Sequence, residues 1–197
     1  MGLVGEDGKR RLLAIARAAV EAAVGGEAPP AFDEPSAELQ GRQGCFVTLK
    51  NPRRAQPLRG CLGHFTSSEP LYQLVAETAR SSATGDPRFV GDPVTTAELD
   101  DVEIEISVLS PLERTREPLS LELGTHGIYV KRGPAAGCFL PQVATEHHMS
   151  KETFLSSCCS HKAGLPADAW KDEATEVYLF SAEVFGEAAL GRGGGAS

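Results

Sequence analysis

Apolar residues recur with a helical period in two segments of the amino-terminal half of the chain. Over residues 9–24 they follow the spacing i, i+3, i+4, i+7, with charged residues between them. This pattern predicts an amphipathic helix that ends at Gly25-Gly26. A second apolar stripe begins at Leu71, after Ser67-Ser68-Glu69-Pro70. These hydroxyls and the early proline predict a capped helix that runs to about Ala83.

Alternating or β-rich patterns predict strands elsewhere. The turn-like residues 51–54 separate two such runs and predict a hairpin, and residues 131–134 predict a second one. Residues 102–109 alternate cleanly, so one face is predicted to enter a core while Glu103, Glu105 and Ser107 lie on the other. The predicted strands cover residues 45–49, 58–64, 102–109, 126–130, 137–140 and 176–185.

The order of these elements indicates the fold class. Helices and hairpins are interspersed without regular βαβ alternation, so we expect an α+β fold with a mainly antiparallel sheet and flanking helices. Three further elements are predicted: a proline-rich connector over 27–36, a short helical turn over 142–147 and a helix capped by Ser150. We expect one domain over residues 1–190, followed by a flexible glycine-rich tail over 191–197.

Composition narrows the classes of partner. The formal net charge is -8 and the isoelectric point about 5.2, so the field of the protein repels nucleic acid and anionic membranes. No apolar run approaches the ~18 residues that cross a bilayer. The five cysteines have no spacing typical of a disulfide framework, and the first residues do not resemble a signal peptide. We therefore expect reduced thiols and a cytoplasmic protein without nucleic-acid or membrane partners.

The stretch Leu58–His64 carries the most distinctive chemistry. It places the Cys61 thiol between Gly60 and Gly63, two residues from Arg59. Alternation along a strand puts Arg59 and Cys61 on one face, and a nearby guanidinium favours thiolate over thiol. One interpretation is a nucleophilic or redox thiol. In this interpretation protons are handled by a carboxylate or a histidine, for which the candidates are Glu105, Glu146, His64 and His126. The alternative is that Cys61 is a small packing residue.

Arg59 also has two interpretations. It could bind a ligand carboxylate or phosphate through two parallel hydrogen bonds, or pair inside the fold with Glu103 or Glu105. Asp86 and Arg88 are expected to bind each other and so to hold their own loop together, like a staple. Gln142 either caps exposed backbone at a strand end or binds substrate.

Other familiar sites lack support in the sequence. There is no phosphate-binding glycine loop, no G-x-G-x-x-G, no G-x-S-x-G and no H-E-x-x-H. Cys158 and His161 have a helical spacing but lack further ligands, and His147 and His148 point apart on a helix. We predict no metal site, although Glu146 with either of these adjacent histidines stays a weaker possibility. The sequence does not identify a cofactor, which is left as unknown.

Several segments together resemble a known family. Leu58-Arg59-Gly60-Cys61-Leu62-Gly63 resembles the signature hexapeptide of the AMMECR domain family, whose prokaryotic members include AmmeMemoRadiSam system protein A. Further segments resemble the same family in the same order, and the resemblance covers about residues 12–185. These segments are Ala79–Ser82, Asp86–Phe89, Ile104–Leu112, Gly127-Ile128 and Leu140–Ala144.

The resemblance implies a larger and a smaller subdomain with a cleft between them, lined by the hexapeptide. It also implies a cytosolic location and the company of a Memo-like protein and a radical SAM protein, but no reaction. From it we expect a small-molecule or peptide ligand. We expect catalytic roles for Cys61, Glu105 and Glu146. Ligand contacts are expected from Arg59, Gly60, Gly63, His64, Ser107 and Gln142.

This chain departs from the family pattern at His64 and at His147-His148-Met149, where a small hydroxyl residue and an aromatic-Gly-Trp sequence are usual. These departures alter the expected ligand size and can add a group that titrates near neutral pH. Two functions are compatible with the resemblance. The protein is an enzyme that uses Cys61, or a protein-interaction domain in which Cys61 only packs.

Overall fold

The structure is a computed structural model that describes residues 2–34 and 36–191 and divides into two compact units. Unit 1 comprises Met1–Leu109 with Glu183–Ser197, and unit 2 comprises Ser110–Ala182. The tail predicted for 191–197 lies outside the described residues, except for Gly191. Within the described part of the chain, every helix is too short or too polar to cross a membrane.

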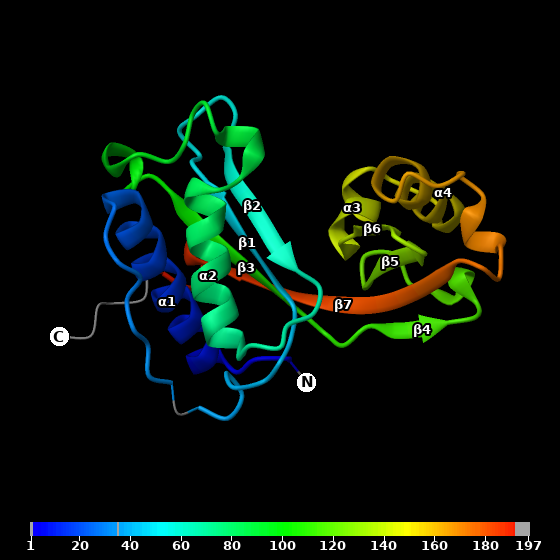
Figure 1. The fold of residues 1–197 in the computed structure, drawn as a ribbon, viewed down its shortest axis with the longest axis horizontal. Helices are drawn as coiled ribbons and strands as arrows, with labels where there is room; N and C mark the ends of the chain where they lie inside the picture. Colours follow the sequence, from blue (N-terminus) through cyan, green and yellow to red (C-terminus); the bar gives the residue numbers. More distant parts are fainter. Residues whose placement is uncertain (1, 35, 192–197) are drawn as a thin grey trace. The chain divides into compact units, whose positions relative to one another are not determined.

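Unit 1 is a sheet with two helices packed on one face. Helices α1 and α2 lie side by side and contact strands β1, β2 and β3 (Figure 1). Strand β2 is at the edge, next to β1, and β3 follows. Both pairs are antiparallel. The helices and strands of unit 1 are α1 (Glu6–Gly25), β1 (Cys45–Lys50), β2 (Leu58–His64), α2 (Leu71–Thr84), β3 (Glu103–Leu109) and α5 (Glu187–Leu190).

The core of unit 1 explains this layering. Alternate residues of β1 and β3, such as Val47 and Ile106, are fully buried with the apolar stripes of α1 and α2. The residues between them, Thr48, Lys50 and Glu105, are only partly buried and lie on the other face of the sheet. A polar face is therefore presented on the side of the sheet that α1 and α2 do not cover.

Unit 2 is a smaller antiparallel sheet with short helices. Strand β7 pairs with β5, β5 pairs with β6, and β4 also pairs with β7. Its core includes Ile128, Phe154 and Val177. The elements are β4 (Glu113–Thr115), β5 (His126–Arg132), β6 (Ala135–Phe139), α3 (Pro141–Glu146), α4 (Lys151–Ser157), a π-helical turn (Cys158–Lys162) and β7 (Glu176–Gly186), whose last residues belong to unit 1.

The α+β class, both hairpins and the two long helices are confirmed. The predicted hydroxyl cap of α2 is wrong, because Pro70 is the N-cap and the Ser67 hydroxyl accepts from the N–H of Glu69 instead. Strand β4 and helix α5 were not predicted, since three or four residues are too few to show a period.

Candidate functional site

A β-bulge at Arg59 determines the shape of the hexapeptide strand. In the β1–β2 ladder Lys50 pairs with Leu58 and Leu49 pairs with Gly60, which leaves Arg59 as the extra residue. A bulge redirects the side chain of the extra residue and breaks the period-two alternation. The prediction that Arg59 and Cys61 share a face assumed this alternation. Their side chains instead have different partners.

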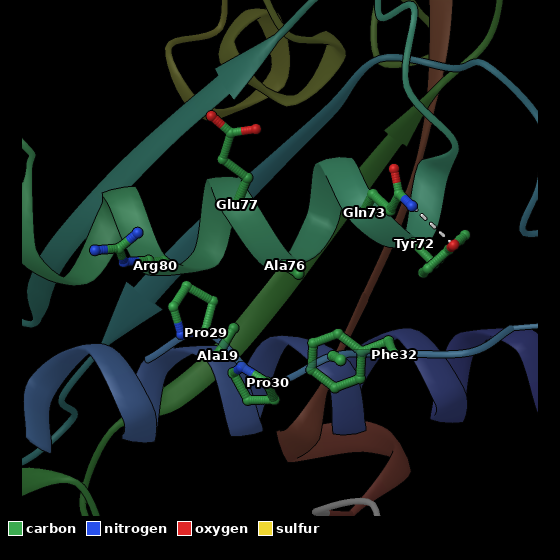
Figure 2. Close-up of a pocket in the computed structure, with 10 residues that line it drawn as sticks. Ala19, Pro29, Pro30, Phe32, Tyr72, Gln73, Ala76, Glu77 and Arg80 are labelled. Atoms are coloured by element: carbon green, nitrogen blue, oxygen red, sulfur yellow. Dashed lines mark hydrogen bonds between the residues drawn. The ribbon is translucent and has the colours of Figure 1, made fainter. Parts of the chain in front are cut away.

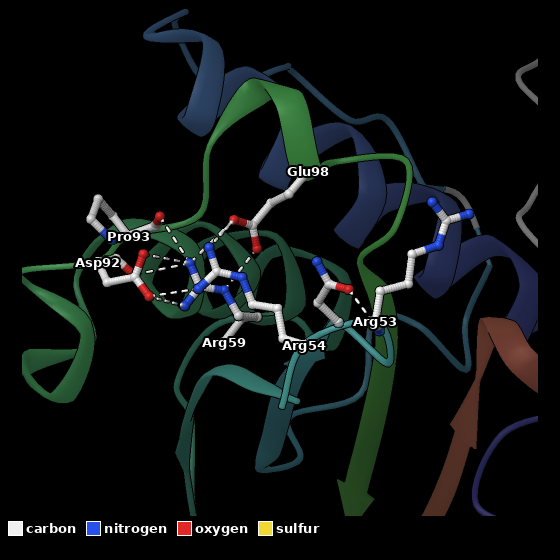
Figure 3. A network of polar contacts seen from close by, with 7 residues as sticks. Arg53, Arg54, Arg59, Asp92, Pro93 and Glu98 are labelled. Carbon is white, nitrogen blue, oxygen red and sulfur yellow. Dashed lines mark hydrogen bonds and ion pairs between the residues drawn. The ribbon is translucent and has the colours of Figure 1, made fainter. Parts of the chain in front are cut away.

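The Arg59 guanidinium lies in a network of internal acceptors (Figure 3). Its Nε donates to Glu98 Oε1 at 2.7 Å, and Nη1 donates to Asp92 Oδ2 at 2.9 Å. Nη2 donates to the carbonyls of Asp92 and Pro93 at 3.0 and 3.1 Å. Arg59 is only 2% exposed, and burial alone would lower its pKa. The bonds to Glu98 and Asp92 outweigh burial, so the pKa is raised and Arg59 stays charged.

The predicted pairing of Arg59 with Glu103 or Glu105 is wrong. Glu105 accepts from Lys50 Nζ at 3.0 Å, across the β1–β3 pair. The bulge turns Arg59 toward the loop between α2 and β3, where Asp92 and Glu98 lie. Asp92 lies in irregular chain and Glu98 ends a 3-10 helix of only three residues, Thr96–Glu98, so no sequence pattern indicates either acid.

Close packing accounts for the two glycines of the hexapeptide. A Cβ added at Gly60 would lie 1.9 Å from the Ser82 carbonyl oxygen of α2. A Cβ at Gly63 would lie 2.3 Å from the Phe46 ring of β1. Both positions therefore need glycine for packing within unit 1. Ligand contact by Gly60 and Gly63 stays a prediction.

Side chains from α2 and the following loop hold the β2 backbone. The Ser82 hydroxyl accepts from the N–H of Leu62 at 3.0 Å and donates to the carbonyl of Val47 at 2.9 Å. Asp86 Oδ2 accepts from the N–H of Cys61, and Arg88 Nη2 donates to the carbonyl of Cys61, both at 2.9 Å. These bonds occupy backbone groups that an edge strand would otherwise expose.

The Asp86–Arg88 staple predicted from the sequence is present. Arg88 donates to the Asp86 carboxylate through Nε and Nη2 at 3.0 and 2.6 Å. The bonds from Arg88, with those from the backbone of Cys61 and Arg88, lower the pKa of Asp86 to about 2 although burial opposes this shift. Asp86 is therefore a fixed anion beneath the backbone of Cys61.

The Cys61 side chain is partly buried on the polar face of the sheet. Thr48 is its direct cross-strand partner, and the Thr48 hydroxyl donates to Cys61 Sγ at 3.3 Å. A hydroxyl donor to sulfur stabilises negative charge there. Sequence reasoning missed Thr48. The hairpin register would have revealed it, because Thr48 lies opposite Cys61 once the bulge is placed.

Glu105 is in the same cross-strand row but not beside the thiol. Thr48 pairs with both Cys61 and Glu105, so two strand spacings, roughly 9.6 Å, separate the outer members of the row. Ser107 lies further along β3 and is buried, and His64 is exposed at the end of β2. A proton transfer between Cys61 and Glu105 therefore needs a bridging water or substrate.

The other four cysteines are poor nucleophiles because burial suppresses their ionisation. Burial raises the pKa of Cys45 to about 12 and that of Cys138 to about 11. Burial also raises the pKa of Cys158 and Cys159. All five thiols are free. By this comparison Cys61 is the strongest candidate for thiol chemistry.

The remaining predicted residues belong to unit 2. Gln142 is partly buried and Glu146 exposed, both on α3, while His126 begins β5 and its Nδ1 accepts from the N–H of Glu122. His147 and His148 are exposed and follow α3. A joint role of Gln142 or Glu146 with Cys61 stays a prediction. The described residues contain no group of three or more His, Cys, Asp or Glu placed to hold a metal ion.

Unit 1 also has a pocket on the outer side of its helices (Figure 2). It has a volume of about 390 Å³ and lies between α1, α2 and the connector that carries Pro29, Pro30 and Phe32. Tyr72 lies at one end of the group of lining residues, and its hydroxyl accepts from the amide of Gln73 at 2.9 Å. None of the residues predicted to form the site lines this pocket.

Comparisons with known proteins agree on one family. The AMMECR1 family model matches residues 13–185. A protein from Methanothermobacter thermautotrophicus is 41% identical over 92% of this chain and 95% of its own length. Protein PH0010 from Pyrococcus horikoshii is 40% identical over 89% of this chain and 88% of its own. The crystal structure of PH0010 matches with a TM-score of 0.83 and covers 94% of both chains at 36% identity. The names of these proteins state no activity.

Proposed function

This chain belongs to the AMMECR1 family, and on that premise we propose that it is an enzyme whose nucleophile is the thiol of Cys61. Its substrate is a small molecule or a peptide that reaches the polar face of the unit 1 sheet. The observation that carries this proposal is the hydrogen bond from the Thr48 hydroxyl to Cys61 Sγ at 3.3 Å. Such a donor favours the thiolate, which is the reactive form.

The surroundings of Cys61 support an attacking role. Asp86 and Arg88 fix the backbone of Cys61, so the direction of the side chain is held before any substrate binds. The thiolate gives its electron pair to an electrophilic carbon, and the displaced group leaves with the electrons of the broken bond. Glu105, held by Lys50, accepts or returns protons through a bridging water or substrate.

Site-resolved alkylation tests this proposal. The folded protein is treated with iodoacetamide over a range of pH, and the labelling rate of each cysteine is measured by mass spectrometry. We expect Cys61 to be labelled faster than the other four cysteines. The buried Cys45 and Cys158 are internal controls for unfolding. A Cys61 rate that only matches that of the partly buried Cys138 would reject the nucleophile.

A protein-interaction domain is the second candidate. The observation in its favour is that the hexapeptide residues have structural roles. Arg59 pairs with Glu98, and Gly60 and Gly63 are glycines because neighbouring atoms leave no room for a side chain. In this case the polar face binds a partner protein. The Memo-like and radical SAM proteins are the first partners to test. Cys61→Ser should then leave a pull-down of these proteins unchanged, while Lys50→Ala on the same face should weaken it.

Both candidates expect Cys61→Ser to retain binding, so turnover is the measurement that separates them. The enzyme predicts that Cys61→Ser loses turnover but retains substrate binding. The Arg59→Ala variant is unsuitable for either test, because it would remove the guanidinium that pairs with the buried Glu98 carboxylate and would therefore destabilise the fold.

A further inference from the structure

Arg59 also lines an open hollow on unit 1. This hollow has a volume of about 610 Å³, and three arginines face it: Arg54, Arg59 and Arg88. Phe89 and Leu58 provide apolar walls. The guanidinium carbons of Arg59 and Arg88 lie 5.9 and 5.6 Å from the centre of the Phe89 ring. Two guanidinium groups beside an aromatic ring, with a third lining the same hollow, are typical of a site for an anionic group with an apolar body.

The acids that neutralise these arginines differ in burial. Glu98 and Asp86 are buried and form part of the packed structure. The Asp92 side chain, in contrast, is 59% exposed. Its carboxylate accepts from Arg54 Nη1 at 2.6 Å and from Arg59 Nη1 at 2.9 Å (Figure 3). Asp92 thus places a carboxylate at the open side of a buried guanidinium.

Arg59 would remain well paired if that carboxylate moved away. Glu98 accepts from its Nε and Nη2, and the carbonyls of Asp92 and Pro93 accept from Nη2. The Asp92 carboxylate accepts from Nη1 at 2.9 Å and from Nη2 at 3.4 Å. Because Nη2 keeps these other acceptors, Nη1 is the donor that loses its partner among the described residues. Replacing this carboxylate with another one therefore preserves the pairing of the buried cation.

The local chain leaves room for the exchange. Val90 is 74% exposed, and a Cβ added at Gly91 would have no atom within 4 Å. The backbone of Asp92 is held separately, by its N–H to the Phe89 carbonyl and by its carbonyl to Arg59. A rotation of the Asp92 side chain can thus release Arg54 and Arg59 without unfolding the loop.

We propose that this hollow is a binding site for a carboxylate attached to an apolar or aromatic group, and that Asp92 occupies it in the free protein. The ligand carboxylate takes the place of the Asp92 carboxylate between Arg54 and Arg59, and its apolar group lies against Phe89 and Leu58. The site does not depend on the thiol chemistry of Cys61. Ligand binding should therefore persist in Cys61→Ala.

Chemical rescue with acetate tests the site. Asp92→Ala removes the internal carboxylate, so added acetate should raise the melting temperature saturably, whereas chloride at equal ionic strength should not. Asp101→Ala is the matched control, because Asp101 pairs with the exposed Arg53 outside the hollow. Equal acetate effects on the two variants would overturn the proposal. If Asp92→Ala does not fold, Asp92→Asn provides the same comparison.

A titration with benzoate tests the displacement itself. We expect saturable shifts of the Arg59 Nε–H signal in NMR spectra of the wild type, and affinity about tenfold higher in Asp92→Ala, because the internal competitor is gone. Arg54→Gln should weaken binding in both backgrounds. No saturable shift in the wild type, or equal affinity in wild type and Asp92→Ala, would show that Asp92 is not displaced.

Discussion

The Asp86 carboxylate accepts the backbone N–H of Cys61 at 2.9 Å, although 25 residues separate the two in the sequence. Through Arg88 the same carboxylate is also linked to the carbonyl of Cys61. The strand that carries the thiol is therefore held from outside the sheet by a charged pair. This relationship makes the stability of the unit depend on the charge of Asp86.

Acid should weaken the protein through Asp86. Its pKa is lowered to about 2 from an ordinary value of 3.8, so the charged form is favoured by folding. The stabilisation of the folded state by the Asp86 charge is complete above pH 4 and is lost as the pH falls toward 2. The lowering of the Asp86 pKa corresponds to about 2 kcal/mol of free energy of unfolding. Asp86→Asn should lower the free energy of unfolding by about that amount at pH 7 and flatten its pH dependence between 4 and 2. Urea titrations at several pH values measure both effects.

The exposed Asp33 is the control for this prediction. Asp33→Asn should leave the free energy of unfolding and its acid dependence nearly unchanged. If both variants retain the pH dependence of the wild type, Asp86 is not the titrating anion that holds β2.

Gly60 should not tolerate a methyl group. The Cβ of Gly60→Ala would meet the Ser82 carbonyl oxygen at 1.9 Å, so strand and helix must separate. We expect a loss of about 3 kcal/mol in the free energy of unfolding. Gly91→Ala is the control, because its Cβ would enter open space. Equal losses in the free energy of unfolding for the two variants, measured by chemical denaturation, would contradict this account.

The buried pair of Arg17 and Glu187 should hold the carboxyl-terminal helix α5 to the core of unit 1. Glu187 binds Arg17 through both oxygens and also accepts from the N–H of Ile104 at 2.9 Å. Glu187→Ala leaves the buried Arg17 guanidinium without its carboxylate partner, although the carbonyls of Leu99 and Val102 still accept from it, so we expect a loss of about 3 kcal/mol. The exposed pair broken by Asp101→Ala should cost at most about 1 kcal/mol. Thermal and urea unfolding of both variants compare these costs.

Local patterns predicted the elements better than the contacts of the site. The hairpin and the alternating strand β3 follow from periodicity, which depends on neighbouring residues alone. The partners of Arg59 depend on a bulge and on a loop that has no period, so the predicted pair with Glu105 was wrong. Thr48 was missed because its role follows from cross-strand register. The link from Asp86 to the Cys61 backbone depends on tertiary packing and had no local signal.

Labelling of Cys61 in two Thr48 variants tests the central claim most directly. Thr48→Ser retains a hydroxyl donor to Sγ, whereas Thr48→Val has nearly the same shape without a donor. If the hydroxyl supports the thiolate, the rate of iodoacetamide labelling at neutral pH should stay close to wild type in Thr48→Ser and fall several-fold in Thr48→Val. Equal rates in all three proteins, with Cys45 still protected, would contradict a role for Thr48 in activating Cys61.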